Sequence, residues 1–87
     1  MSRYRIDYTP GAEKQLRAIR DARVSAPIRR AIEKLADNPR PPGCLKLVGE
    51  VNQWRVRVGD WRVVYVIENG RLVILVVRVA PRGGVYG

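Results

Sequence analysis

The sequence contains no histidine and only one cysteine, Cys44. Without an imidazole there is no histidine general base, no Ser-His or Cys-His nucleophile pair, and no histidine ligand for a metal. A single cysteine excludes an intramolecular disulfide, which is typical of proteins of the reducing cytosol. These two absences exclude much of the usual catalytic chemistry and favour a cytoplasmic location.

Acidic residues and long apolar runs are also scarce. The 8 Asp plus Glu residues are scattered, and no D-x-D or E-x-x-E pair occurs. The spacing therefore predicts neither a metal site nor a cofactor, although separated carboxylates can still converge in a fold. The N-terminal residues Met-Ser-Arg-Tyr-Arg lack the apolar core of a signal peptide. No run approaches the roughly 20 apolar residues of a membrane span, so we expect no membrane partner.

Positive charge is abundant. Lys and Arg together number 17, of which 14 are Arg, and the formal net charge is +9. Arginine forms forked hydrogen bonds to phosphate, and a small domain this basic usually meets a polyanion. We therefore expect a nucleic acid as the first candidate partner and an acidic protein as the second.

Residues 54–65 predict a β-hairpin whose two faces differ sharply. Apolar and cationic residues alternate up to Val58, and Gly59-Asp60 suits a two-residue turn. One face then carries both tryptophans, and the other gathers Arg55, Arg57 and Arg62, with Arg57 opposite Arg62. Like charges opposed across a strand pair are destabilising, so an anion-binding site is one explanation. The other explanation is that the apolar stems of these arginines cover the sheet while their charged ends remain in water.

The rest of the chain reads as one α+β domain over residues 1–87. Residues 3–8 alternate as a short strand, and Thr9 caps a helix that starts at Pro10. Ser25 is the expected N-cap of a second helix, which should end near Asn38, so the two helices form a hairpin.

The second half predicts strands only. Residues 44–48 suggest a short strand, Asn69-Gly70 a tight hairpin turn, and residues 71–80 an inner strand. We expect a small, mainly antiparallel sheet with the helix hairpin packed on its tryptophan face.

If the turn at Asn69-Gly70 is tight, Arg62 shares its face of the sheet with an aliphatic area. No remaining segment of the chain is expected to cover this area, which is formed by Val64, Val66, Val73, Leu75 and Val77. Such an area suggests a partner, with a homodimer or coverage by loops as the alternatives.

Several stretches together resemble a known family. They are the helix pair, Lys46-Leu47 before a turn, the block W-R-V-R-V-G-D-W-R-V-V-Y, the aliphatic strand, and R-G-G-V-Y at residues 82–86. Over essentially its whole length the chain resembles the RelE/ParE toxin superfamily of type II toxin–antitoxin modules, and the G-D-W-R-V-V-Y block is the most specific part.

The resemblance to the RelE-like branch implies a metal-free, ribosome-dependent endoribonuclease that cleaves mRNA in the A site and so inhibits translation. Carried over position by position, it implies the catalytic residues Arg55, Arg57, Arg62, Arg82 and Tyr86, with Lys46, Arg55 and Arg57 binding RNA. It further implies a cognate antitoxin as partner, with operator DNA bound only through the antitoxin complex.

The residue types suit this chemistry, with one departure. Guanidinium groups stabilise the charge that builds on a phosphate attacked by the neighbouring 2′-hydroxyl. Some relatives have lysines where Arg55 and Arg57 stand, and an arginine is not deprotonated in a protein. General-base duty then falls to Tyr86, to substrate or ribosome groups, or to none. Two other functions remain open, a ParE-type inhibitor of DNA gyrase and a non-catalytic RNA-binding module.

Overall fold

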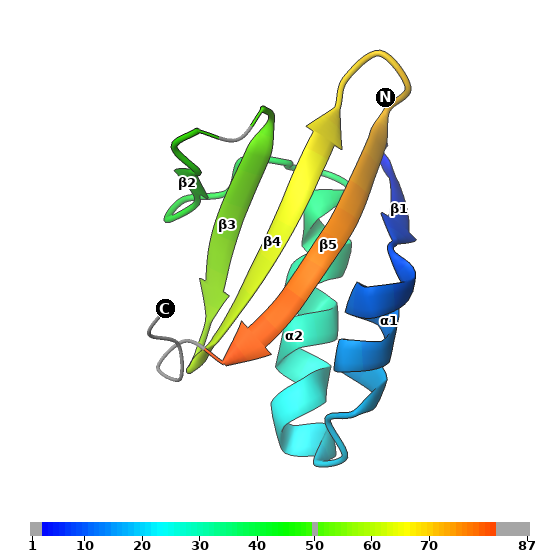
Figure 1. Ribbon diagram of the computed structural model, residues 1–87, viewed down its shortest axis with the longest axis vertical. Helices are drawn as coiled ribbons and strands as arrows, with labels where there is room; N and C mark the ends of the chain where they lie inside the picture. The colour runs from blue at the N-terminus through cyan, green and yellow to red at the C-terminus, as the bar shows by residue number, and fades with distance from the viewer. Residues whose placement is uncertain (1–2, 50, 82–87) are drawn as a thin grey trace.

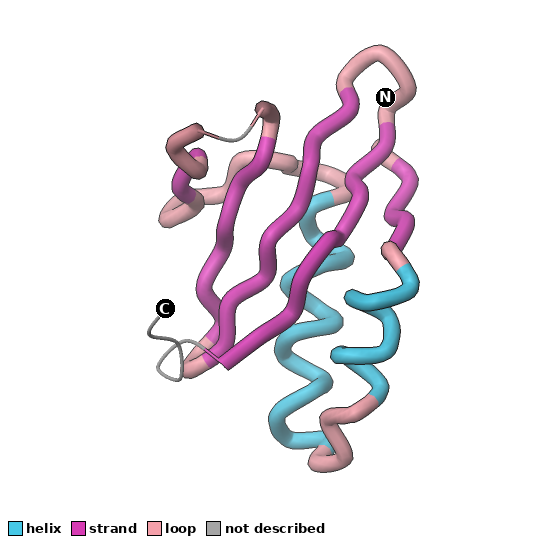
Figure 2. Tube along the Cα trace, in the orientation of Figure 1, coloured by secondary structure: helices cyan, strands magenta, loops and turns pink. Residues whose placement is uncertain are grey.

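The computed structural model describes residues 3–49 and 51–81. The elements in chain order are β1 (Arg5–Tyr8), α1 (Pro10–Arg17), α2 (Ala22–Leu35), β2 (Leu45–Lys46), β3 (Gln53–Val58), β4 (Trp61–Glu68) and β5 (Val73–Pro81). The five strands form one sheet in the order β1-β5-β4-β3-β2. Both helices lie on the same side of that sheet (Figures 1 and 2). The α+β class and the two-helix layer on one sheet face are thus confirmed.

Strand β5 is an inner strand of this sheet and lies between β1 and β4. It pairs parallel with β1 and antiparallel with β4, and the β4–β3 and β3–β2 pairs are also antiparallel. The sheet is therefore mainly antiparallel, and residues 71–80 do contain an inner strand, as expected. The first strand returns beside the last because β5 is buried and needs partners on both of its edges.

The core lies between the helices and the face of the sheet that carries the tryptophans, here called the helix face. Val63, Tyr65, Ile74 and Val76 are fully buried on it, against Ile28, Ile32 and Leu35 of α2. Trp54 and Trp61 are only half-buried and pack against the edge of this cluster. The expected assignment of the tryptophan face to the helices is confirmed, although aliphatic side chains and Tyr65 fill its centre.

The two helices begin with different side-chain caps. The hydroxyl of Thr9 accepts a hydrogen bond from the Ala12 amide at 3.1 Å, as its place before Pro10 predicts. The second helix begins at Ala22, so the prediction that Ser25 caps it was wrong. The Asp21 carboxylate accepts from the Arg23 amide at 2.9 Å and caps the helix one turn earlier.

The connection between β4 and β5 also differs from the expected tight turn at Asn69-Gly70. The loop spans four residues, 69–72, and Leu72 adopts a positive φ of 54°. A register shift between Val64 and Tyr65 then adds one residue to β5. Together these changes place Ala80 opposite Arg62 and Arg78 opposite Val64. Arg78 therefore lies on the face away from the helices, here called the open face, where the tight turn had placed Val77.

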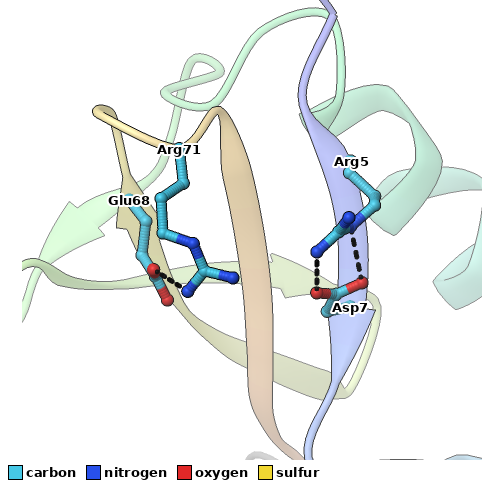
Figure 3. Close-up of polar contacts among 4 residues, drawn as sticks. All are labelled: Arg5, Asp7, Glu68 and Arg71. Carbon is cyan, nitrogen blue, oxygen red and sulfur yellow. Dashed lines mark hydrogen bonds and ion pairs between the residues drawn. The ribbon is translucent and has the colours of Figure 1, made fainter.

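The open face is not the bare aliphatic area that the sequence suggested. Val73 is only 3% exposed, and ion pairs stand on either side of β5 near it (Figure 3). They join Arg5 Nη2 to Asp7 Oδ2 at 3.0 Å and Arg71 Nη1 to Glu68 Oε1 at 2.9 Å. Long charged side chains thus cover the aliphatic strand, as their apolar stems allow.

The most exposed large apolar residues lie in the β2–β3 loop instead, where Val48 is 99% and Val51 83% exposed. Neither helix in the described part of the chain is long and apolar enough to cross a membrane.

Candidate nucleic-acid interface

The register of β3, β4 and β5 builds two rows of residues on the open face. One row runs from Arg55 through Val64 to Arg78, and the next from Arg57 through Arg62 to Ala80. Directly opposed side chains in an antiparallel pair share a face, so all four arginines project to the same side. The sequence predicted three of them together, and the structure brings those three together.

Arg62 is the centre of this arrangement. Its Cα lies opposite that of Arg57, and it is the diagonal neighbour of both Arg55 and Arg78. Diagonal neighbours in a sheet are about 7–8 Å apart, within reach of long side chains. Arg62 is half-buried, and its Nε atom is shielded from solvent. Three other arginines are therefore the sheet neighbours of a half-buried one.

A cleft of about 330 Å³ opens over β3, β4 and β5. We call it the arginine cleft. It is lined by Leu47, Arg55, Arg62, Val64, Arg78, Ala80 and Pro81. Val64 and Ala80, each 8% exposed, are small and form its floor between the arginines. A second hollow of about 340 Å³ adjoins it through Arg55 and includes Arg57. The four arginines are therefore distributed over two hollows that share Arg55.

The charged residues that line the arginine cleft are all arginines. No acidic residue lines it among the described residues. Within residues 3–49 and 51–81, the ion pairs join Arg3 to Asp37, Arg5 to Asp7, Arg23 to Asp21 and Arg71 to Glu68, all away from the cleft. Several guanidinium groups along one hollow attract anions strongly, because the surrounding protein screens charge less than water does.

A buried tyrosine fixes the strand behind the cleft. The Tyr65 hydroxyl donates to the Pro39 carbonyl at 2.7 Å, and the side chain is fully buried. Burial raises the pKa of Tyr65 well above its ordinary value, so the phenol stays protonated and keeps donating. Nearby, the Arg40 guanidinium lies 5.0 Å from the centre of the Trp54 ring. These contacts tie residues 39–40 to β3 and β4, and Tyr65 has a structural part here.

Lys46, expected to hold RNA with Arg55 and Arg57, does not line the arginine cleft. Its Cα is in register with Trp54, so it belongs to the helix side of the sheet edge. Its neighbours Leu45 and Leu47 border the two hollows instead, because side chains alternate along a strand. The two remaining candidates, Arg82 and Tyr86, lie outside the described residues.

Arg78 is the cleft residue that sequence reasoning missed. An unbroken alternation from the expected turn assigns it to the helix face, and only the register shift at Val64/Tyr65 moves it to the open face. The available signal was chemical, because Arg78 is the one charge in an otherwise aliphatic stretch from Leu72 to Ala80. An unpaired arginine is too costly to bury beside Ile74 and Val76.

The described residues offer no metal site. Among residues 3–49 and 51–81, no group of three or more Asp, Glu or Cys side chains lies together.

The fold and the cationic open face place the chain in a defined structural class. A chain of the intact E. coli RelBE toxin–antitoxin complex superposes with a TM-score of 0.79 at 21% identity, covering 90% of this chain and 95% of that one. A chain of the Mycobacterium tuberculosis RelBE2 complex gives 0.80 at 23% identity, with 94% of each chain covered. A chain of the Pyrococcus horikoshii RelE–RelB complex gives 0.76 at 26% identity, covering 98% and 100%.

The family assignment follows from the sequence match. The model of the ParE toxin of the type II toxin–antitoxin system parDE matches residues 6–86. The chain belongs to this family and so to the RelE/ParE toxin superfamily, which confirms the resemblance found in the sequence. No curated protein sequence matches the chain significantly.

Proposed function

We propose that this toxin is a ribosome-dependent endoribonuclease that cleaves mRNA in the A site without a metal. The observation that supports this most is the gathering of four arginines on the open face, around a cleft that no described acidic residue lines. Arginines opposed across a strand pair destabilise the fold, so their placement there calls for a functional explanation. A phosphodiester lying across β3, β4 and β5 provides one.

The proposed reaction is an internal transfer at phosphorus. The 2′-oxygen of the ribose attacks the adjacent phosphorus and loses its proton, while the bond from phosphorus to the 5′-oxygen breaks and that oxygen gains a proton. The products are a 2′,3′-cyclic phosphate and a 5′-hydroxyl. Charge builds on the non-bridging oxygens as the reaction proceeds, and in this proposal Arg62 donates to them.

The other arginines supply position. Arg57 lies opposite Arg62, and Arg55 lies two residues further along β3. In this proposal they hold the neighbouring backbone in line. None of these guanidinium groups is a proton acceptor. In this proposal Arg82 adds a further cation, Lys46 contacts RNA outside the cleft, and proton transfer falls to Tyr86 or to groups of the substrate or the ribosome.

A cognate antitoxin is the proposed protein partner. The similar chains from E. coli, M. tuberculosis and P. horikoshii come from toxin–antitoxin complexes. An acidic segment of the antitoxin would compete with RNA for the same arginines of the open face. Operator DNA would then be bound through the antitoxin complex, as expected for such modules.

A second candidate function is inhibition of DNA gyrase. The observation that favours it is the family match itself, whose description is that of a ParE toxin. Under this function the arginine cleft has no reacting phosphate to hold, and cleavage of mRNA is not expected.

A translating cell extract separates the two functions. The wild-type chain should produce messages truncated at A-site codons with 5′-hydroxyl ends, detected by primer extension. Arg62→Ala and Arg82→Ala should each abolish the cuts, whereas Arg30→Ala, an exposed position on α2, should leave them unchanged. Intact messages together with gyrase-linked double-strand breaks would establish the gyrase function instead.

A further inference from the structure

Arg78 is the one member of the arginine cleft to which neither the motif nor the family comparison gives a task. It lies on β5, opposite Val64, and borders the cleft together with Arg55 and Arg62. It is exposed, and none of the ion pairs among the described residues includes it. Its guanidinium group is therefore available to a ligand.

The position of Arg78 depends on a costly local feature. The register shift at Val64/Tyr65 leaves an extra residue in β5 and interrupts the regular pairing of two central strands. Bulges of this kind re-aim side chains and are common beside functional sites. Here the shift moves an arginine from the apolar helix face, where it has no partner, to the cleft.

We propose that Arg78 binds a second phosphate of the nucleic-acid strand, adjacent to the phosphate held at Arg62. Arg62 and Arg78 are diagonal neighbours, so their backbones are about 7–8 Å apart, of the order of the distance between successive phosphates of an extended strand. The small floor residues Val64 and Ala80 leave room for the backbone between them. This role rests on the proposed function, and it makes the substrate cross the sheet from β3 to β5.

In this arrangement Arg78 is a binding residue that fixes the strand, while Arg62 faces the reacting phosphate. A planar guanidinium fork binds phosphate through two parallel hydrogen bonds, which an ammonium group cannot reproduce. Arg78→Lys should therefore keep the charge contribution and lose part of the affinity. Because the side chain is exposed, neither Arg78→Lys nor Arg78→Ala should change the melting temperature by more than a degree or two.

The test is equilibrium binding of a short single-stranded RNA whose riboses are all 2′-O-methylated, so that it cannot be cleaved. Anisotropy titrations at several salt concentrations give the affinity and its salt dependence. Arg78→Ala should weaken binding about tenfold and reduce the slope of log K against log salt by about 0.7. Arg71→Ala is the matched control, because it removes one exposed charge from the loop just before the same strand, outside the cleft. It should bind like the wild type.

The outcomes separate this inference from the proposed function. If Arg78→Ala binds like Arg71→Ala while the wild type still cuts mRNA in the extract, the second phosphate site is wrong and the nuclease stands. Binding that depends on Arg78 in a chain that cuts no mRNA supports the site and overturns the nuclease. A wild-type chain that does not bind the RNA at all overturns this inference directly.

Discussion

The Cα atoms of Arg57 and Arg62 lie directly opposite each other in the antiparallel β3–β4 pair. Two guanidinium groups in this relationship repel each other, and the repulsion is greatest when no anion lies between them. Regular alternation from the Gly59-Asp60 turn predicted this pairing, and the structure confirms it.

The first prediction concerns this repulsion. Arg57→Gln should raise the free energy of unfolding by about 0.2–1 kcal/mol, because it removes one of two like charges from an opposed pair. Chemical denaturation in low salt measures the gain, and the gain should shrink in 1 M salt, which screens the repulsion in the wild type.

Arg71→Gln is the control for that prediction, since its partner Glu68 is acidic and its loss should bring no gain. Equal stabilities of Arg57→Gln and the wild type in low salt would contradict the account of the hairpin. The same Arg57→Gln variant should bind RNA less tightly, because the substitution that stabilises the fold also removes a cation that binds the RNA.

The second prediction uses the floor of the arginine cleft. Ala80 lies opposite Arg62, so Ala80→Glu places a carboxylate where it can pair with that guanidinium group. RNA binding and toxicity should be lost while the melting temperature is kept or raised. Ala80→Gln adds the same volume without the charge and should retain more binding. If the Glu and Gln variants bind equally well, Arg62 does not hold the ligand.

The third prediction concerns the buried phenol. Tyr65→Phe removes the donor to the Pro39 carbonyl and should cost about 1–3 kcal/mol of folding free energy at neutral pH, measured by urea denaturation.

The pH dependence of that loss provides a separate check. Burial raises the pKa of Tyr65 from an ordinary value of 10.0. The phenol therefore contributes stability that is fully present below pH 10, and the contribution falls above it, because the unfolded phenol ionises while the folded one does not. The gap between the wild type and Tyr65→Phe should accordingly narrow above pH 10. If the difference in folding free energy between the wild type and Tyr65→Phe widened above pH 10 instead, the phenol would ionise in the native state.

The fourth prediction tests where the second helix begins. Asp21→Ala should lower the melting temperature by several degrees, whereas Ser25→Ala should have little effect, since Asp21 caps the helix and Ser25 lies inside it. Asp21→Asn should keep most of the stability, because asparagine is also a good cap.

At acid pH, the stabilisation that Asp21 provides relative to alanine should be lost. Hydrogen bonds from the side chain and then the backbone of Arg23 hold the pKa of Asp21 below its ordinary 3.8. The stabilisation is therefore present above that pH and is lost as the pH falls through the lowered value. Thermal melts of Asp21→Ala and the wild type should converge in strong acid. A difference that persists there would show that the charge does not contribute.

Local patterns were sufficient wherever neighbouring residues decide the structure. Thr9-Pro10 identified the start of the first helix, and the alternation over residues 54–65 identified the hairpin, its register and the shared face of Arg55, Arg57 and Arg62. They failed at Asp21, where two adjacent caps compete and the longer helix buries more apolar surface. They also failed at Asn69-Gly70, where the loop has four residues, and at the register shift between Val64 and Tyr65, which brings Arg78 opposite Val64.

The sequence by itself determined that the protein is basic and α+β, and that a hairpin presents arginines on one face, because these properties follow from composition and from the two-residue period of a strand. Only the tertiary structure decided that β1 lies parallel to β5, that Lys46 falls outside the cleft and that Arg78 falls inside it. Each of these depends on a pairing between distant strands. A register shift of one residue, as at Val64/Tyr65, turns every later side chain of the strand to the opposite face.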